Sequence, residues 1–273
     1  MAEELREDTV REAVRDRYAE IAKTGSSCCG DSSCCGLPSD AGESSENKAA
    51  GEEALRLGYS QDDLIAVPEG ANLGLGCGNP QAIAQLKPGE VVVDLGAGPG
   101  FDCFLAARAV GPEGLVIGVD MTPEMVGKAR ENARKSDCGN VDFRLGEIEH
   151  LPVADATADA VISNCVINLS PNKPAVYREA FRVLKPGGRL AVSDVVATAE
   201  LPQDWREDMR LLSACISGAS TVAEVEEMLR TAGFADIRVE PNDKSREFIQ
   251  DWEPGTNLGD YVLSASMSAI KPR

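Results

Sequence analysis

Apolar residues are distributed in two different patterns along this chain, one typical of β-strands and one typical of helices. Between Gly89 and about Val196, short runs rich in valine and isoleucine are separated by segments whose apolar residues recur at helical spacing. The strand-like runs cover residues 91–95, 115–119, 141–145, 158–164 and 189–196, and the helical patterns cover about 100–110, 122–136 and 174–184. Strands that alternate with helices predict an α/β fold, with a mainly parallel sheet covered by helices on both faces.

The flanking regions have other patterns. Residues 3–22 place apolar residues at helical spacing among charges, and Gly25 is a stop signal, so we expect an N-terminal helix there. A Ser/Gly-rich stretch with a repeated Ser-Ser-Cys-Cys-Gly follows, and residues 37–51 are small and polar, which predicts a loop or mobile linker. Towards the C-terminus we expect helices near 204–217 and 221–232 and strands near 235–240 and 261–270.

Composition narrows the class of protein. The chain has 273 residues, of which 43% are hydrophobic and 26% charged, so it can bury a sizeable core as a soluble globular protein. Its formal net charge of −18 and the absence of a basic run argue against a nucleic-acid partner. Its apolar runs are far shorter than the roughly 18 residues of a membrane span. The acidic N-terminus does not resemble a secretory signal, so we expect a cytoplasmic protein without a membrane partner.

A glycine-rich loop follows the first predicted strand. In Val91-Val-Val-Asp-Leu-Gly-Ala-Gly-Pro-Gly100, glycines 96, 98 and 100 permit positive φ and a close approach of the backbone to a ligand. The third glycine comes one residue earlier than in the dinucleotide fingerprint G-x-G-x-x-G. Asp120 ends the second predicted strand, where a carboxylate can accept hydrogen bonds from ribose hydroxyls. The pattern predicts a site for a nucleotide-like cofactor.

The end of the third predicted strand adds to this site. Glu147 can accept a hydrogen bond from an exocyclic adenine amine, and Ile148 can pack on the ring. The alternative interpretation is three surface turns that are acidic for other reasons. The candidate cofactor-binding residues are Asp94, Gly96, Ala97, Gly98, Gly100, Asp120, Met121, Glu147, Ile148 and Asn164.

Nine cysteines and a single histidine, His150, bear on the chemistry. In a reducing compartment, cysteines favour metal binding, redox work or burial over a disulfide framework. A single histidine argues against a catalytic mechanism that needs a histidine base and against a histidine-rich zinc site. For Cys103 and Cys138 we favour burial as small core residues.

Three other cysteines fall near the ends of predicted strands. Cys165 ends the strand that begins at Ala158, Cys77 lies in a flexible glycine-rich loop before the first strand, and Cys215 follows the fifth. Ligands of open α/β sheets bind beyond the carboxyl ends of the strands. The three thiols can therefore form a cage for one soft centre there, or each can be a buried core residue.

The glycine loop resembles that of class I S-adenosylmethionine-dependent methyltransferases. Their acid, G-x-G-x-G and second acid are matched by Asp94, the three loop glycines and Asp120, and Leu184-Lys-Pro-Gly-Gly188 is similar to a turn of that superfamily. This resemblance covers about residues 85–200. It implies S-adenosylmethionine as the cofactor and a Rossmann-like, seven-stranded, mostly parallel sheet whose last strand is inserted antiparallel.

A finer resemblance, from about Gly58 to Phe234, is to arsenite methyltransferases. It is carried by Ser163-Asn-Cys-Val-Ile-Asn-Leu169, Pro171-Asn-Lys173, Gly76-Cys-Gly78, Asp102-Cys103, Ser193-Asp-Val195 and the segment around Cys215. One departure is Leu75, where animal and algal members have tyrosine. The resemblance implies that Cys77, Cys165 and Cys215 bind trivalent arsenic, supplied as arsenite or its thiol conjugates.

The family also implies a disulfide relay between Cys77 and an N-terminal cysteine, with a small thiol or a thioredoxin-type protein as reductant. The candidates for the relay are Cys28, Cys29, Cys34 and Cys35. The implied domains are 1–50, an N-terminal helix and cysteine-rich linker; 51–198, which binds S-adenosylmethionine; and 199–273, an arsenic-binding cap that covers the substrate and completes the sheet. The alternatives are a methyltransferase for a small carbon, oxygen or nitrogen substrate and a non-enzymatic thiol protein that binds metalloids.

Overall fold

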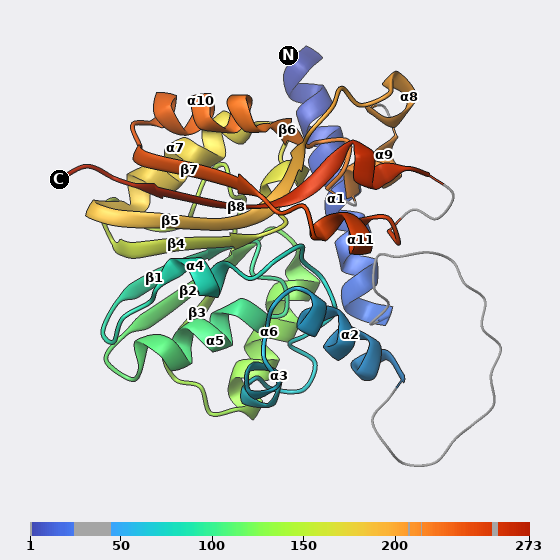
Figure 1. Ribbon diagram of the computed structural model, residues 1–273. Coiled ribbons are helices and arrows are strands. Elements are labelled where there is room, and N and C mark those ends of the chain that lie inside the picture. The colour runs from blue at the N-terminus through green and yellow to red at the C-terminus, as the bar shows by residue number, and fades with distance from the viewer. Residues whose placement is uncertain (1, 25–44, 207, 214, 253–255) are drawn as a thin grey trace.

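One mixed β-sheet forms the centre of the protein (Figure 1). The computed structural model describes residues 2–24, 45–206, 208–213, 215–252 and 256–273. The strands are β1 (Val91–Leu95), β2 (Leu115–Asp120), β3 (Val141–Leu145), β4 (Ala158–Asn164), β5 (Leu184–Ala197), β6 (Ser220–Thr221), β7 (Ala235–Pro241) and β8 (Val262–Ile270). Their order is β3-β2-β1-β4-β5-β8-β7, and the two-residue β6 pairs with β5. Strands β1 to β5 are parallel, and β8 is antiparallel between β5 and β7, which confirms the predicted sheet.

Helices cover both faces of the sheet, as predicted. They are α1 (Ala2–Thr24), α2 (Ser45–Arg56), α3 (Gln61–Ala66), α4 (Pro80–Ala84), α5 (Phe101–Val110), α6 (Pro123–Lys135), α7 (Lys173–Val183), α8 (Gln203–Arg206), α9 (Met209–Ser213), α10 (Val222–Ala232) and α11 (Ser245–Ile249). Residues of α7 and α10 pack on one face, and residues of α4, α5 and α6 pack on the other. Strand β4 is buried on both faces, with Val161 in the first cluster and Ile162 in the second. Among the described helices, none is long and apolar enough to cross a membrane.

Two expectations for the outer segments were wrong. The single helix predicted over 204–217 is instead the short helices α8 and α9, and Cys215 has a φ of 63°, which a right-handed helix does not accommodate. The part of the predicted 37–51 linker that the structure describes is helical from Ser45, because α2 places Ala54 in a buried cluster and so gains tertiary packing, and residues 37–44 lie outside the described residues. Helix α2 also runs across the predicted domain boundary at residue 50.

Short helices α3 and α4 lie before the first strand and were not predicted. The capping residues of these two helices were the sequence signals from which they could have been predicted. Ser60 and Asp63 form a capping box at α3, and the Asn79 side chain accepts the amide of Ala82 at α4. These helices hold the loop that carries the first candidate cysteine.

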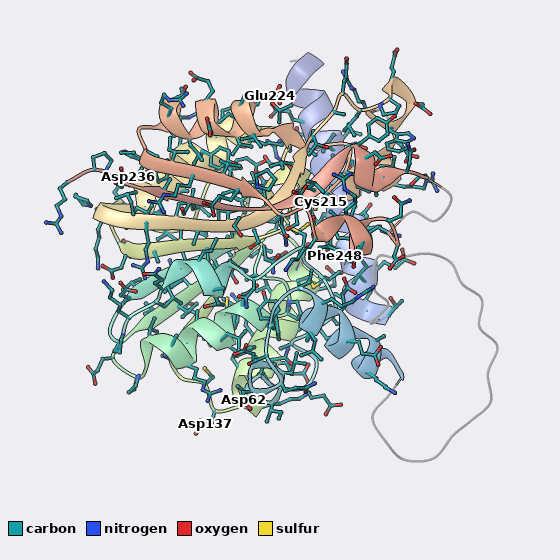
Figure 2. All side chains as sticks on the ribbon, viewed as in Figure 1. Asp62, Asp137, Cys215, Glu224, Asp236 and Phe248 are labelled. Carbon is teal, nitrogen blue, oxygen red and sulfur yellow. The ribbon has the colours of Figure 1, made fainter. Side chains whose placement is uncertain are left out.

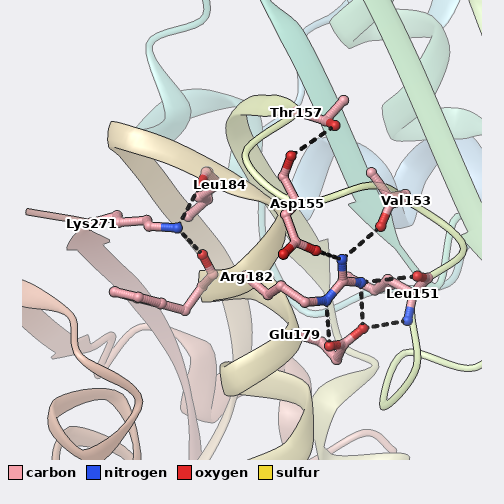
Figure 3. Close-up of polar contacts among 9 residues, drawn as sticks. Leu151, Val153, Asp155, Thr157, Glu179, Arg182, Leu184 and Lys271 are labelled. Carbon is pink, nitrogen blue, oxygen red and sulfur yellow. Dashed lines mark hydrogen bonds and ion pairs between the residues drawn. The ribbon is translucent and has the colours of Figure 1, made fainter. Parts of the chain in front are cut away.

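A hydrogen-bonded arginine fixes the segment after β3 (Figure 3). Arg182 of α7 donates to the carbonyl oxygens of Leu151 and Val153, at 3.1 and 2.8 Å, and pairs with Asp155 at 2.7 Å. Glu179 accepts from Arg182 and from the Leu151 amide. Because this segment directly follows residues 147–149, the network holds one wall of the candidate site in place.

Candidate active site

A cavity of about 570 Å³ lies beyond the carboxyl ends of the central strands. Its volume is typical of sites for small molecules and cofactors. It extends from the glycine loop to Cys165 and Cys215, and Figure 2 shows Cys215 and Phe248, which both line it, near the centre of the view. The predicted site residues in its wall are Asp94, Gly96, Ala97, Gly98, Asp120, Met121, Ile148, Asn164, Cys165 and Cys215.

The glycine loop adopts a backbone that requires glycine. Gly96, Gly98 and Gly100 have φ values of 67°, 52° and 101°. A Cβ on Gly96 would lie 2.4 Å from Cγ2 of Val166, whereas the Cβ position of Gly98 has no described heavy atom within 4 Å other than those of Gly98 and its two chain neighbours. Side chains therefore pack tightly around the first glycine, and the second leaves open space for a ligand to approach the backbone.

Asp120 fixes this loop from the neighbouring strand. Its carboxylate accepts the Gly98 amide at 2.9 Å and the Thr122 amide at 2.8 Å. Burial raises its pKa, and these two hydrogen bonds oppose the shift. The carboxylate is thus held at the edge of the cavity, where the sequence predicted an acceptor for ribose hydroxyls.

Two further carboxyl groups lie in the cavity wall. Burial, followed by the nearby charge of Asp102, raises the pKa of Asp94 well above its usual value, although the Cys103 thiol donates to it at 3.1 Å. Burial raises the pKa of Asp102 to about 6, against hydrogen bonds from Asn164 and Tyr59. Acceptor-rich walls beside an open glycine loop fit S-adenosylmethionine, which is a nucleoside with cationic sulfonium and ammonium groups.

The raised pKa of Asp102 predicts a pH-dependent stability. A carboxyl group whose folded pKa lies near 6, above its usual 3.8, binds a proton in the folded state that the unfolded chain has already released. The contribution of this group to the free energy of unfolding is therefore fully present below the unfolded pKa, and it is lost as pH rises through about 6. The free energy of unfolding should increase from pH 7 to pH 5, and Asp102→Asn should reduce this increase.

The measurement is urea unfolding at both pH values. Asp142→Asn is the control, because Asp142 is half-exposed on β3 and lies 2.8 Å from Arg144. An equal pH effect in the two variants would contradict the role assigned to Asp102.

The three candidate thiols form one cluster at the other end of the cavity. Cys165 and Cys215 line its wall, whereas Cys77, which contacts Cys165, is not among the described residues that line it. Cys165 and Cys215 have φ values of 56° and 63°, an uncommon backbone for residues other than glycine that often marks functional sites. The Cys215 thiol donates to the Cys165 carbonyl at 2.9 Å, and the Cys165 thiol interacts with the thiols of Cys77 and Cys215. The sheet thus brings together residues that are far apart in the sequence.

These thiols are protonated at neutral pH. Burial raises the pKa of Cys77 to about 11. The pKa of Cys165 also lies well above its usual value, because its contacts with Cys77 and its burial outweigh a hydrogen bond from Cys215. For Cys215, the contact with Cys165 and burial raise the pKa.

A buried carboxylate, Asp194, stands beside the thiols and was not predicted as a site residue. One of its oxygens and the sulfurs of Cys77 and Cys165 lie within 4.8 Å of one another. It accepts the amides of Ile167 and Val195, at 2.9 and 2.8 Å, and thereby shapes the turn that follows Cys165. The segment Ser193-Asp-Val195 was the available signal, but it did not indicate which residue Asp194 would approach.

Cys77 is held more firmly than a flexible loop would allow, so that expectation was wrong. Its side chain is 1% exposed, its amide donates to Asn164 at 3.1 Å and its carbonyl accepts from Ser264 at 2.5 Å. Cys103 is buried and Cys138 packs against a buried cluster, as expected. The predicted relay cysteines at 28, 29, 34 and 35 lie outside the described residues.

Glu147, at the end of β3, was predicted to contact adenine, but it lies beside Arg11 instead. Glu147 is not among the described residues that line the cavity, and its Oε2 lies 3.7 Å from Nε of Arg11. Glu149 lines the cavity instead, and it accepts from Ser170 at 2.6 Å and from Arg11 at 3.4 Å. Arg11 and Tyr18 of α1 line the cavity as well, so the N-terminal helix forms part of its wall.

The fold and the cavity together define a class I S-adenosylmethionine-dependent methyltransferase. A family model described as a methyltransferase domain matches residues 86–233. The arsenite methyltransferase of Halobacterium salinarum is 55% identical over 265 residues, which are 97% of this chain and 67% of that protein. The chain therefore belongs to the arsenite methyltransferase family.

Other relatives agree with this assignment. The arsenite methyltransferase of Aquipseudomonas alcaligenes is 43% identical over 63% of this chain and 51% of its own, so the chain spans about half of that relative. The crystal structure of an arsenic(III) S-adenosylmethionine methyltransferase from Chlamydomonas reinhardtii matches with a TM-score of 0.61 and 35% identity, over 82% of this chain and 73% of that one. A phosphoethanolamine N-methyltransferase of Haemonchus contortus, 21% identical with a TM-score of 0.59, shares the fold.

Proposed function

We propose that this protein transfers a methyl group from S-adenosylmethionine to trivalent arsenic bound by Cys77, Cys165 and Cys215. The observation that supports this most is a cluster of three thiols beside a cavity whose other end is the glycine loop: Cys165 and Cys215 line the cavity, and Cys77 contacts Cys165. Trivalent arsenic bound to three sulfurs keeps a lone pair, so methylation needs no proton acceptor. This agrees with a chain whose single histidine, His150, is not among the described residues that line the cavity.

The protonated thiols suit this substrate. Each thiol replaces one hydroxide of arsenite: a sulfur–arsenic bond forms, an arsenic–oxygen bond breaks, and the thiol proton leaves with the hydroxide as water. S-adenosylmethionine supplies an electrophilic methyl group. The protein aligns the arsenic with that group and excludes water, through buried thiols and the apolar wall of Leu169 and Phe248.

A disulfide relay completes the proposal. Methyl transfer formally oxidises arsenic from the trivalent to the pentavalent state. Two thiols that join as a disulfide release two protons and return two electrons, which restores trivalent arsenic. We assign Cys77 and one of Cys28, Cys29, Cys34 and Cys35 to this step, and a small thiol or a thioredoxin-type protein to reduction of the disulfide by exchange.

The test is a methyl-transfer assay with arsenite, S-adenosylmethionine and excess glutathione, with products resolved by arsenic speciation. We expect methylated arsenicals that depend on both substrates. If S-adenosylhomocysteine binds but no methylated arsenic forms, the proposal fails in favour of a methyltransferase for a carbon, oxygen or nitrogen substrate. Tight arsenic binding without any methyl transfer would instead indicate a metalloid-binding thiol protein.

A further inference from the structure

The side-chain amide of Asn164 has more hydrogen-bond acceptors than it can serve. Its Nδ2 lies 2.9 Å from the carbonyl of Gly78, 3.0 Å from Oη of Tyr59 and 3.2 Å from Oδ2 of Asp102. Its Oδ1 accepts the amide of Cys77 at 3.1 Å. Because an amide nitrogen carries two hydrogens, the three acceptors compete for them.

The loop that carries Cys77 lies directly on this amide. A Cβ on Gly76 would lie 2.9 Å from both Nδ2 and Oδ1 of Asn164, and a Cβ on Gly78 would lie 2.9 Å from Cβ of Ser193. Glycine on both sides of Cys77 therefore permits the close approach. The position of the Cys77 sulfur depends on how firmly Asn164 holds the backbone on either side of it.

The same amide reaches the cofactor end of the site. Asn164 and Asp102 both line the cavity, together with Gly98 of the glycine loop. Tyr59 donates to Asp102 at 2.9 Å and packs edge-on against Phe101, which also lines the cavity, with the ring centroids 4.8 Å apart. One side chain thus contacts the cofactor cavity and the Cys77 loop simultaneously.

We propose that Asn164 is a positioning residue that couples occupancy of the cofactor cavity to the position of Cys77. A cofactor that engages Asp102 removes one competing acceptor, and Nδ2 then bonds fully to the carbonyl of Gly78. The loop tightens, and Cys77 is held for the substrate. The coupling deepens the proposed function and rests on it, because that function makes Cys77 a ligand of the substrate.

The test follows alkylation of Cys77 by iodoacetamide in the full-length protein, with peptide mass spectrometry, with and without saturating S-adenosylhomocysteine. One additional buried hydrogen bond corresponds to a change of about tenfold in loop opening. In the wild type, the cofactor product should slow labelling of Cys77 by about this factor. In Asn164→Ala, labelling without ligand should be at least about tenfold faster, and the ligand should no longer change it.

Two cysteines outside the network serve as internal controls. Cys103 is buried against the sheet, so faster labelling there reports general opening of the fold, and the half-buried Cys138 reports the reactivity of the reagent. The proposal requires the change to be confined to Cys77. Slowing by S-adenosylhomocysteine that persists unchanged in Asn164→Ala would overturn it.

For Tyr59→Phe we expect the opposite effect on the rate at which Cys77 is labelled. It removes one competing acceptor and keeps the ring contact with Phe101, so Cys77 should label more slowly without ligand and respond less to the ligand. Loss of stability accelerates labelling and cannot produce this result, whereas faster labelling of Cys77 would overturn the proposal. No arsenic is present in these measurements, so their failure is distinguishable from failure of the methylation assay.

Discussion

Cys165→Ser and Cys215→Ser are each expected to lower arsenite methylation by at least about a hundredfold while leaving the affinity for S-adenosylhomocysteine within about twofold. Serine keeps the size and a hydrogen-bonding group, including the donation from position 215 to the Cys165 carbonyl, so the fold should be retained. Oxygen is a much poorer ligand for a soft centre than sulfur. Displacing the arsenic by even 1 Å from its alignment costs about this factor in rate.

The measurements are arsenic speciation for activity and calorimetry for cofactor binding. Cys138→Ser is the matched control, because this thiol is half-buried and is not among the described residues that line the cavity. Full activity in both test variants would exclude the three-thiol site. It would return the cysteines to the role of core residues.

Asp120→Ala should raise the dissociation constant for S-adenosylhomocysteine by about 10- to 100-fold. The change removes the acceptor predicted for the ribose and leaves the amides of Gly98 and Thr122 without their carboxylate. Each lost buried hydrogen bond costs about 1–3 kcal/mol, and 1.4 kcal/mol corresponds to a factor of ten in affinity.

Calorimetric titration with S-adenosylhomocysteine tests this effect, and Asp142→Ala is the control at a half-exposed acid. Binding of phenylarsine oxide to the thiols should be unchanged in Asp120→Ala. An unaltered cofactor affinity would show that Asp120 shapes the loop without contributing to binding.

The fold was predicted where local pattern and burial agree. Runs such as residues 91–95 and 158–164 are mostly apolar without strict alternation, because parallel strands are buried on both faces, and the structure places β1 and β4 there. The prediction of one helix over 204–217 was wrong. The sequence there is compatible with a helix, but tertiary contacts hold Cys215 in a left-handed backbone conformation. The antiparallel insertion of β8 came from the family resemblance, since strand order depends on contacts between distant segments.

The residues of the candidate site likewise fall into those that the sequence predicted and those that it did not. The glycine loop and Asp120 were visible because their roles follow from backbone conformation and from position at the end of a strand. Asp194 and Tyr59 were not visible, because each acts through a partner distant in sequence: Asp194 approaches Cys77, and Tyr59 bonds to Asp102.

By itself, the sequence determined the alternating strands and helices, the glycine turn that requires positive φ, and the supply of thiols in a chain with one histidine. These properties depend on local sterics, periodicity and side-chain chemistry. Only the tertiary structure decided that α1 forms part of the cavity wall, that Cys77 is clamped by Asn164, and that three distant thiols meet. The reason is physical: these features consist of contacts between segments far apart in the chain, and chain folding alone brings such segments together.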